Sequence, residues 1–244
     1  VARLGDRYRC LSFDFSGFGD SPASNHDGSP EAYAHETLAL MDHLGIERAW
    51  IVGHSLGGSV AVWTAHLAPE RVLGVVGLNA GGGIYIQDEF ERFRGAGRQL
   101  LRFRPRWLAE APLLDQVFAR DSVATPLAPT WGRQRLRDFI RADAIAAARA
   151  LLNSTTAEQV HRLPCLMAGL AVPAHFIGGT EDRIMPPDFV RHLASFHPDL
   201  GSGGDNLRLL PNCGHLAMVE QPEAVARALA ALLAQQLQSV EAGV

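Results

Sequence analysis

One short segment carries a candidate nucleophile, Gly53-His54-Ser55-Leu56-Gly57. It stands between a run that predicts a strand and a run that predicts a helix, and G-x-S-x-G in that context is typical of a sharp turn exposing a serine hydroxyl. Small residues two places before and after the serine, Gly53 and Gly57, leave room for its strained backbone. The helix N-terminus favours developing negative charge, which makes the Leu56 N–H a candidate oxyanion donor. The alternative is a glycine-rich turn with an incidental serine.

A serine nucleophile needs a base, and the base needs an acid to orient it. Asp182 and His215 each come directly after a predicted strand. The carboxyl ends of parallel strands meet at one edge of the sheet, so we expect both side chains to lie near Ser55. The alternatives are a solvated loop aspartate, with Glu181 as the rival acid, and a capping or core histidine.

Further candidates concern the substrate. Several aromatic residues of the middle region predict an apolar lining, although packing within helices explains them as well. Two arginines on one predicted helix face suggest a grip on a substrate carboxylate, against the alternative of a solvated face. His54 adjoins the nucleophile and is interpreted as a packing residue that also borders the substrate. The candidate substrate contacts are His54, Phe90, Phe93, Arg94, Arg98 and Trp107.

Strand-like and helix-like runs alternate along the chain, which predicts an α/β fold with a mostly parallel sheet. The predicted strands are 8–15, 49–52, 72–78, 174–178 and 207–210. The predicted helices of the core are 30–44, 56–67 and 222–237, and the glycine-rich run 201–204 predicts a flexible loop. The stretch 84–169 predicts several helices with little strand character. We therefore expect three parts: a first core part (1–83), a helical cap (84–169) and a second core part (170–244).

Composition excludes several classes of protein. All 22 basic residues among the 244 are arginine, so chemistry that needs a lysine amine is excluded. The net charge of −4 gives no electrostatic case for nucleic acid. The three cysteines form no CxxC pair, which argues against a zinc site and against a disulfide framework. We expect a cytoplasmic protein without a membrane span, metal or organic cofactor.

With these motifs in place, the sequence resembles the α/β-hydrolase fold superfamily, and within it the cap-bearing serine hydrolases. The resemblance rests on the Ser55 turn and on three further motifs: Asp14-x-x-Gly17-x-Gly19-x-Ser21, Gly179-x-x-Asp182-x-x-x-Pro186, and Gly214-His215 followed by Glu220-x-Pro222. It implies that Ser55 is the nucleophile, His215 the general base and Asp182 the orienting acid. A serine at the turn disfavours the dehalogenase and epoxide hydrolase members, which use aspartate there.

The resemblance also implies parts that this sequence does not contain. The family's second oxyanion donor and about three strands lie upstream of the strand that ends near Asp14. We expect a missing N-terminal segment to complete the sheet and supply that donor. The expected partner is a small-molecule acyl substrate such as an ester, thioester or lactone, and the oligomeric state stays open. Carbon–carbon bond hydrolysis, perhydrolysis, acyl transfer and a non-catalytic receptor remain alternatives.

Overall fold

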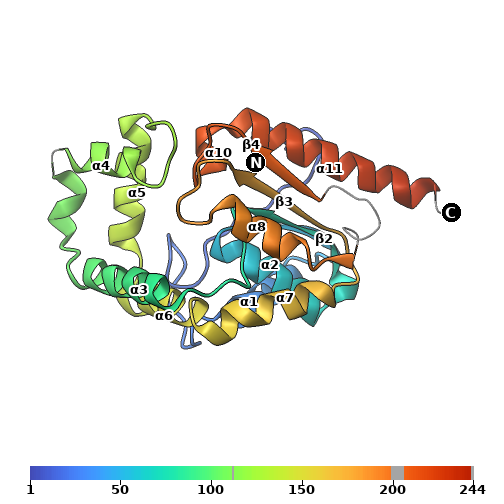
Figure 1. Cartoon of the computed structure of the whole chain (residues 1–244), viewed down its shortest axis with the longest axis horizontal. Helices are drawn as coiled ribbons and strands as arrows, with labels where there is room; N and C mark the ends of the chain where they lie inside the picture. The colour runs from blue at the N-terminus through green and yellow to red at the C-terminus, as the bar shows by residue number, and fades with distance from the viewer. Residues whose placement is uncertain (112, 199–205, 243–244) are drawn as a thin grey trace.

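A computed structural model describes residues 1–111, 113–198 and 206–242 of the chain. Its element order alternates strands with helices, apart from a long run of helices between the second and third strands (Figure 1). The glycine-rich run 201–204, interpreted above as a flexible loop, lies outside the described residues.

The sheet of the described chain has four strands in the order β1-β2-β3-β4, and every neighbouring pair is parallel. The strands are β1 (Ala49–His54), β2 (Val72–Leu78), β3 (Ala174–Gly179) and β4 (Leu207–Leu210). β2 is nearly all buried and apolar, as expected of a strand covered on both faces. The predicted α/β class is therefore confirmed.

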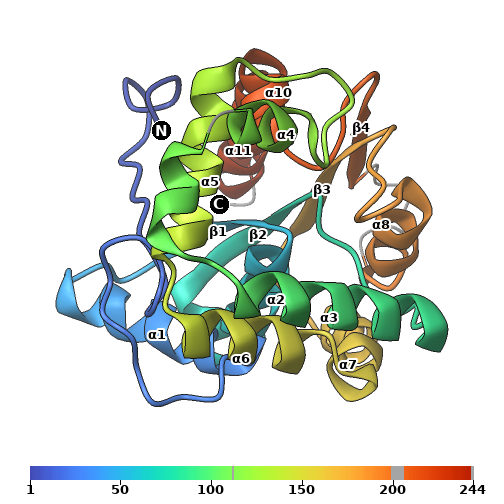
Figure 2. The same cartoon turned by 90° about the vertical axis from the view of Figure 1, so that its left-hand side faces the viewer.

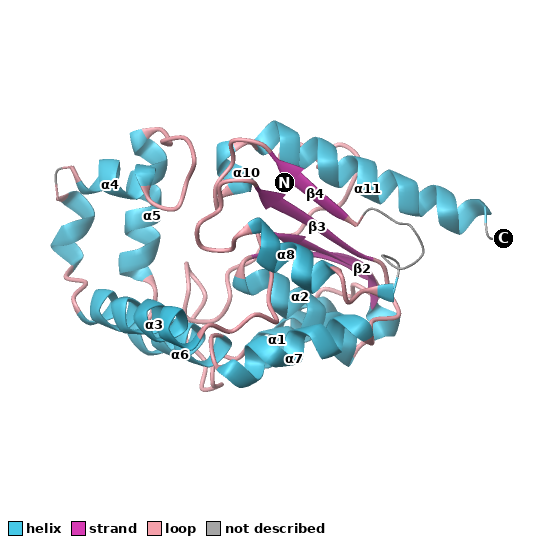
Figure 3. Ribbon diagram, in the orientation of Figure 1, coloured by secondary structure: helices cyan, strands magenta, loops and turns pink. Residues whose placement is uncertain are grey.

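Helices cover both faces of this sheet (Figure 3). The helices that flank the strands are α1 (Pro30–His43), α2 (Leu56–Leu67), the 3₁₀ turn η1 (Pro69–Arg71), α8 (Pro187–Ala194), α10 (Ala217–Glu220) and α11 (Pro222–Ala242). The helices between β2 and β3 are α3 (Gln87–Arg102), η2 (Arg106–Glu110), α4 (Leu114–Arg120), α5 (Pro129–Arg141), α6 (Ala144–Ser154) and α7 (Ala157–Ala168).

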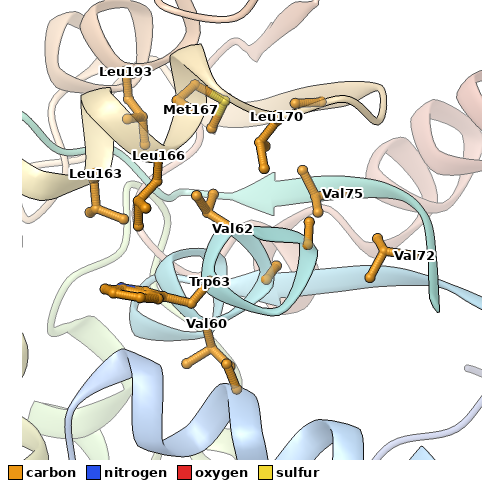
Figure 4. Packing of buried hydrophobic residues seen from close by; sticks show 14 of the residues in the cluster. Val60, Val62, Trp63, Val72, Val75, Leu163, Leu166, Met167, Leu170 and Leu193 are labelled. Atoms are coloured by element: carbon orange, nitrogen blue, oxygen red, sulfur yellow. The ribbon is translucent and has the colours of Figure 1, made fainter. Parts of the chain in front are cut away.

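The main hydrophobic cluster lies between the sheet and helices α2 and α7 (Figure 4). Trp63 of α2 is almost completely buried in it, and Leu166 and Met167 come from α7. Thus α7, although it falls within the predicted 84–169 cap, packs into the core, and α6 adds Ala150 to the same cluster, while α3 to α5 lie to one side of the sheet (Figure 1). A second cluster fills the opposite face, where Val225 and Leu229 of α11 pack.

The first helix shows how local sequence signals become structure. Ser29 Oγ accepts a hydrogen bond from the Ala32 N–H at 3.2 Å, and Pro30 is the first helical residue. Gly45, with φ +62°, follows the C-cap in a conformation that glycine adopts without strain. The helix predicted over 30–44 is confirmed on these signals.

The strand predicted over 8–15 is wrong. These residues form no strand, and no described backbone hydrogen bond joins them to β1. Figure 2 shows the N-terminal trace running beside the sheet without a strand arrow. A strand exists only through pairing with a neighbour, so an apolar, β-prone sequence without one stays an extended loop.

A slot separates this loop from β1. Its volume is about 1110 Å³, with residues 8–13 on one side and Trp50, Ile51 and Val52 of β1 on the other. Side chains of α1 and α11, including Met41 and Leu229, also line it. β1 pairs only with β2 among the described strands, so its other edge faces this apolar slot.

Candidate active site

Ser55 occupies the single residue between β1 and α2. Its φ of 51° and ψ of −117° lie outside the regions that a side-chain-bearing residue readily adopts. The Ser55 N–H donates to the Leu78 oxygen of β2 at 3.0 Å, which holds the turn against the sheet. Strain of this kind costs about 1–3 kcal/mol and persists only where the surroundings enforce it.

Close packing explains which glycines the turn requires. A Cβ on Gly53 would lie 1.9 Å from the Gly57 oxygen, and one on Gly58 would lie 2.2 Å from the Ala80 Cβ. A Cβ on Gly57 would meet nothing within 4 Å. The expectation of a steric need at Gly57 is therefore wrong. The constraint falls on Gly53 and Gly58, because helix α2 crosses β1 and β2 there.

The Leu56 N–H begins α2 and has no hydrogen-bond acceptor among the described residues. The first N–H groups of a helix have no acceptor inside the helix, so this one is free to bind an oxygen beside Ser55. The positive end of the α2 dipole adds a favourable field for an anion.

Asp182 lies in the loop after β3 and is 4% exposed. Its Oδ1 accepts from the N–H groups of Ile184 (2.9 Å) and Met185 (2.8 Å), and its Oδ2 accepts from His215 Nδ1 at 2.8 Å. Burial alone raises the pKa of this carboxyl, but hydrogen bonds, chiefly from His215, outweigh it and hold the pKa below its usual value. The rival Glu181 is exposed instead.

His215 follows β4 and is 7% exposed. Because its Nδ1–H donates to Asp182, the neutral ring carries its free lone pair on Nε2, where a base would take a proton. Its backbone N–H donates to the Ser122 oxygen at 2.9 Å, so the α4–α5 loop holds the histidine loop. No hydrogen bond joins Ser55 Oγ to His215 in the described structure; such contacts are often long before substrate binds.

His54 contacts the same histidine from β1. Its Nε2–H donates to the His215 oxygen at 2.7 Å, and the two ring centroids are 4.7 Å apart. Burial, followed by the nearby His215, lowers the pKa of His54 to about 4. His54 is thus neutral near pH 7, and its described polar contact is to His215.

The other candidate substrate contacts lie on the helices between β2 and β3. Phe90 stacks on Tyr85 with ring centroids 4.4 Å apart, while Phe93 and Trp107 are exposed. Arg94 donates to the Leu152 oxygen and to Thr155 Oγ1. Arg94 and Arg98 border a cavity of about 520 Å³ together with Tyr85, Thr156 and Ala157. None of the described interactions joins these residues to Ser55, Asp182 or His215, so their role as substrate contacts stays a prediction.

Sequence reasoning gave no role to two residues of the site, although Glu220 stands in one of the motifs that carry the family resemblance. Asn79, at the end of β2, donates from Nδ2 to Asp182 Oδ2 at 2.9 Å and to the Gly214 oxygen at 3.0 Å. Glu220 accepts from the Gly214, Leu216 and Ala124 N–H groups, at 3.0, 3.2 and 2.8 Å. The rule that placed Asp182 and His215 at strand ends would also have selected Asn79, which follows β2.

The described residues contain no group of three histidine, cysteine, aspartate or glutamate side chains that could hold a metal ion. In the same part of the chain, no helix has the length and apolarity needed to cross a membrane.

Comparison with known proteins identifies the family. The profile of the Alpha/beta hydrolase family matches residues 1–228. This chain belongs to that family. A strand-ending serine, a buried aspartate and a buried histidine at one edge of a parallel sheet agree with that membership.

Individual relatives are more distant. The chain is 28% identical over 239 residues to the dihydrolipoyllysine-residue acetyltransferase component of an acetoin cleaving system from Pseudomonas putida. That alignment covers 94% of this chain and 57% of the relative, and the next curated relatives, uncharacterised Mycobacterium proteins, are covered to 66%. The chain therefore spans less than two thirds of these proteins.

Solved structures share the fold. A thermophilic esterase from Thermogutta terrifontis has a TM-score of 0.76 at 24% identity, covering 96% of this chain and 83% of the other. An enol-lactonase from Burkholderia xenovorans has a TM-score of 0.73 at 24% identity, covering 96% and 84%. At this identity the likeness shows the fold, which bears out the α/β-hydrolase resemblance.

Proposed function

We propose that this protein is a serine hydrolase that cleaves an ester, thioester or lactone-type carbonyl substrate through an acyl-enzyme on Ser55. The observation that carries the proposal is the 2.8 Å hydrogen bond from His215 Nδ1 to buried Asp182, beside the strained Ser55 turn. Esterase and lactonase structures among the fold neighbours support the same class of reaction.

In the proposed mechanism, His215 Nε2 takes the hydroxyl proton of Ser55 as Oγ attacks the carbonyl carbon. The carbonyl oxygen becomes an oxyanion, and the Leu56 N–H stabilises it. His215 then gives its proton to the leaving group as the tetrahedral intermediate collapses to the acyl-enzyme. Water, deprotonated by His215, releases the acid and restores Ser55. The chemistry uses no metal or organic cofactor.

Asp182 serves this mechanism as an anion. Its four hydrogen bonds and lowered pKa keep it charged while His215 carries a proton, and the opposite charges stabilise that state.

The exposed aromatic side chains of Phe93 and Trp107 support a small or medium apolar acyl group as substrate. The three free cysteines support a reducing, cytoplasmic setting.

Acyl transfer is the second candidate, favoured by the 28% identity to an acetyltransferase component. Both reactions share the acyl-enzyme and differ in the nucleophile that removes the acyl group. An added alcohol or thiol distinguishes them: a transferase forms the new ester or thioester at the expense of free acid.

We also propose that an extended polypeptide segment fills the slot beside β1, completes the sheet and supplies a second oxyanion donor. The apolar side chains that face this slot support it, because Leu11 is 52% exposed and Val52 is 44% exposed without such a segment. If residues 1–244 alone fold as a monomer and hydrolyse esters at a normal rate, this part of the proposal is wrong.

The decisive experiment is labelling with a fluorophosphonate probe, followed by a panel of ester, thioester and lactone substrates. We expect labelling of the parent protein and of a Ser59→Ala control, which removes a nearby serine within α2, and no labelling of Ser55→Ala. Absent labelling of the parent, or unchanged labelling of Ser55→Ala, would overturn the proposed function.

A further inference from the structure

Asn79 is a completely buried polar residue at the carboxyl end of β2. Its φ is +47°, a conformation that asparagine and aspartate tolerate better than most residues. Its backbone N–H donates to the Ile177 oxygen of β3 at 2.7 Å. Burial of an amide side chain is costly unless it forms hydrogen bonds, so the contacts of this side chain explain its presence.

Those contacts join the two loops that carry the candidate acid and base. Asn79 Nδ2 donates to Asp182 Oδ2 in the loop after β3 and to the Gly214 oxygen in the loop after β4. Both N–H groups of one rigid amide are therefore used. Asp182 Oδ2 accepts from His215 Nδ1 as well, so Asn79 and His215 share one carboxylate oxygen.

The type of side chain matters because an amide stays neutral while donating two hydrogen bonds. A leucine of similar size would leave Asp182 Oδ2 with His215 as its remaining donor, and the Gly214 oxygen without its described side-chain donor. An aspartate would place a second carboxylate against Asp182. A neutral double donor holds an anion and a carbonyl oxygen at once without adding a charge beside them.

We propose that Asn79 is a positioning residue that fixes Asp182 relative to His215 and sets the basicity of that pair. The proposal rests on the serine hydrolase function proposed above, and Asn79 acts through Asp182 without touching the substrate. By sharing Oδ2, its N–H draws electron density from the carboxylate and limits how strongly Asp182 favours protonated His215.

Other ionisable groups surround the pair. His54 lies against His215 from β1, Glu220 bonds the N–H of Gly214, and Cys213 and Glu181 belong to the two loops themselves. None of these groups is altered by a substitution at Asn79. A change in the titration of His215 is therefore assigned to the altered contact with Asp182.

The test compares three variants. Asn79→Leu removes the amide, and Asn79→Asp keeps the shape and the tolerated backbone while adding charge. Asn206→Leu is the matched control, since Asn206 is also buried and donates from Nδ2 to a backbone oxygen at 3.3 Å. Its Oδ1, like that of Asn79, has no hydrogen-bond partner among the described residues. The Asn206 contact is to Ala194 rather than to the acid or base.

Two readouts follow each variant: the pH dependence of kcat/KM for an ester, and the NMR titration of the His215 ring. We expect kcat to fall about 10- to 100-fold in Asn79→Leu with KM nearly unchanged. The acid limb of the pH profile and the His215 titration should move to higher pH, and further in Asn79→Asp where its added carboxyl is ionised. Asn206→Leu should move neither.

The proposal is overturned if the Asn79 variants fold and shift the His215 titration no more than Asn206→Leu does. If Asn79→Leu does not fold, Asn79→Asp decides alone, by the same titration. The NMR readout needs no turnover. A different outcome separates the two proposals. If the Asn79 variants shift the His215 titration but the parent protein is not labelled by fluorophosphonate, the proposed function is refuted and the role of Asn79 is supported.

Discussion

The two halves of the site differ in how completely the described structure holds them. In the acid–base half, formed by the loops after β3 and β4 with Asn79, the polar atoms of Asp182 and the N–H groups around His215 have partners. In the nucleophile half, formed by β1, Ser55 and residues 8–13, the Leu56 N–H has no described acceptor and β1 borders a slot of about 1110 Å³.

The difference follows from the order of the strands. β3 lies between β2 and β4, so the loops that follow these three strands contact one another and share hydrogen bonds. β1 has a described partner only in β2, so Ser55 relies on its own turn and on the Leu78 oxygen. The side chains of the acid–base half should therefore be poorly accessible to solvent and chemical probes. In the nucleophile half, the conformation of Ser55 should depend on close packing at its turn.

The largest effect on stability and labelling is expected from substitutions at the Ser55 turn. Gly53→Val forces side-chain atoms into the Gly57 backbone, so we expect a loss of about 3 kcal/mol or more in unfolding free energy and no fluorophosphonate labelling. Gly57→Ala enters open space and should change stability by less than about 1 kcal/mol. Chemical denaturation measures both. Equal damage from the two changes would refute the steric account of the turn.

Thiol reactivity compares the halves directly. Burial, followed by the charges of Glu220 and Asp182, raises the pKa of Cys213 to about 12. Cys10 lines the slot and is only half-buried. In the native protein at pH 8 we expect iodoacetamide to modify Cys10 at least about 100-fold faster than Cys213.

Peptide mass spectrometry follows each cysteine, and exposed Cys165 provides the upper reference for the rate. In denaturant the three should react alike. Native Cys213 that is alkylated as fast as Cys10 would show that the acid–base half is not closed.

A smaller effect is expected from Glu220→Gln. Its carboxylate accepts hydrogen bonds from backbone N–H groups of the histidine loop and of the α4–α5 loop. A hydrogen bond to a charged group contributes about 1.5–3 kcal/mol to stability. We expect unfolding free energy to fall by about 1–2 kcal/mol and kcat to fall about tenfold. Glu223→Gln, at an exposed ion pair with Arg3, should change stability by less than about 0.5 kcal/mol. Similar losses in both variants would contradict this role of Glu220.

The effect of His54 on stability is smallest near pH 7 and develops only as the pH falls. Its pKa is lowered from 6.5 to about 4 on folding, so between these values the unfolded state binds more protons. Stability contributed by the neutral ring is present above pH 6.5 and is lost as the pH falls toward 4, with a slope of up to about 1 kcal/mol per pH unit. His54→Gln should flatten this slope, and His35→Gln, at an exposed position of α1, should not. Unfolding measured across pH 4–7 gives both slopes.

Much of this arrangement could be predicted from local patterns. The Ser29-Pro30 cap placed α1, the apolar run 72–78 placed β2, and the ends of three strands selected Ser55, Asp182 and His215. The reason is that caps, burial and strand direction are properties of short segments. The catalytic roles of the three residues remain proposals, to be tested by activity.

What could not be predicted depends on distant neighbours. Residues 8–15 have the sequence of a strand, but pairing requires a partner that local sequence does not reveal. The role proposed for Asn79 depends on two loops, 103 and 135 residues further along the chain, that meet at its amide. The open space at Gly57 likewise reflects the angle at which α2 leaves β1.

The central claim is that Ser55 carries the acyl group during turnover, and intact-mass spectrometry of the protein mixed with an activated ester tests it most directly. A rapidly quenched reaction should show a mass increase equal to one acyl group, located by peptide mapping to the peptide that contains Ser55. The increase should be absent from Ser55→Ala. Steady ester hydrolysis by Ser55→Ala, or an acyl group found elsewhere in the parent, would contradict the account.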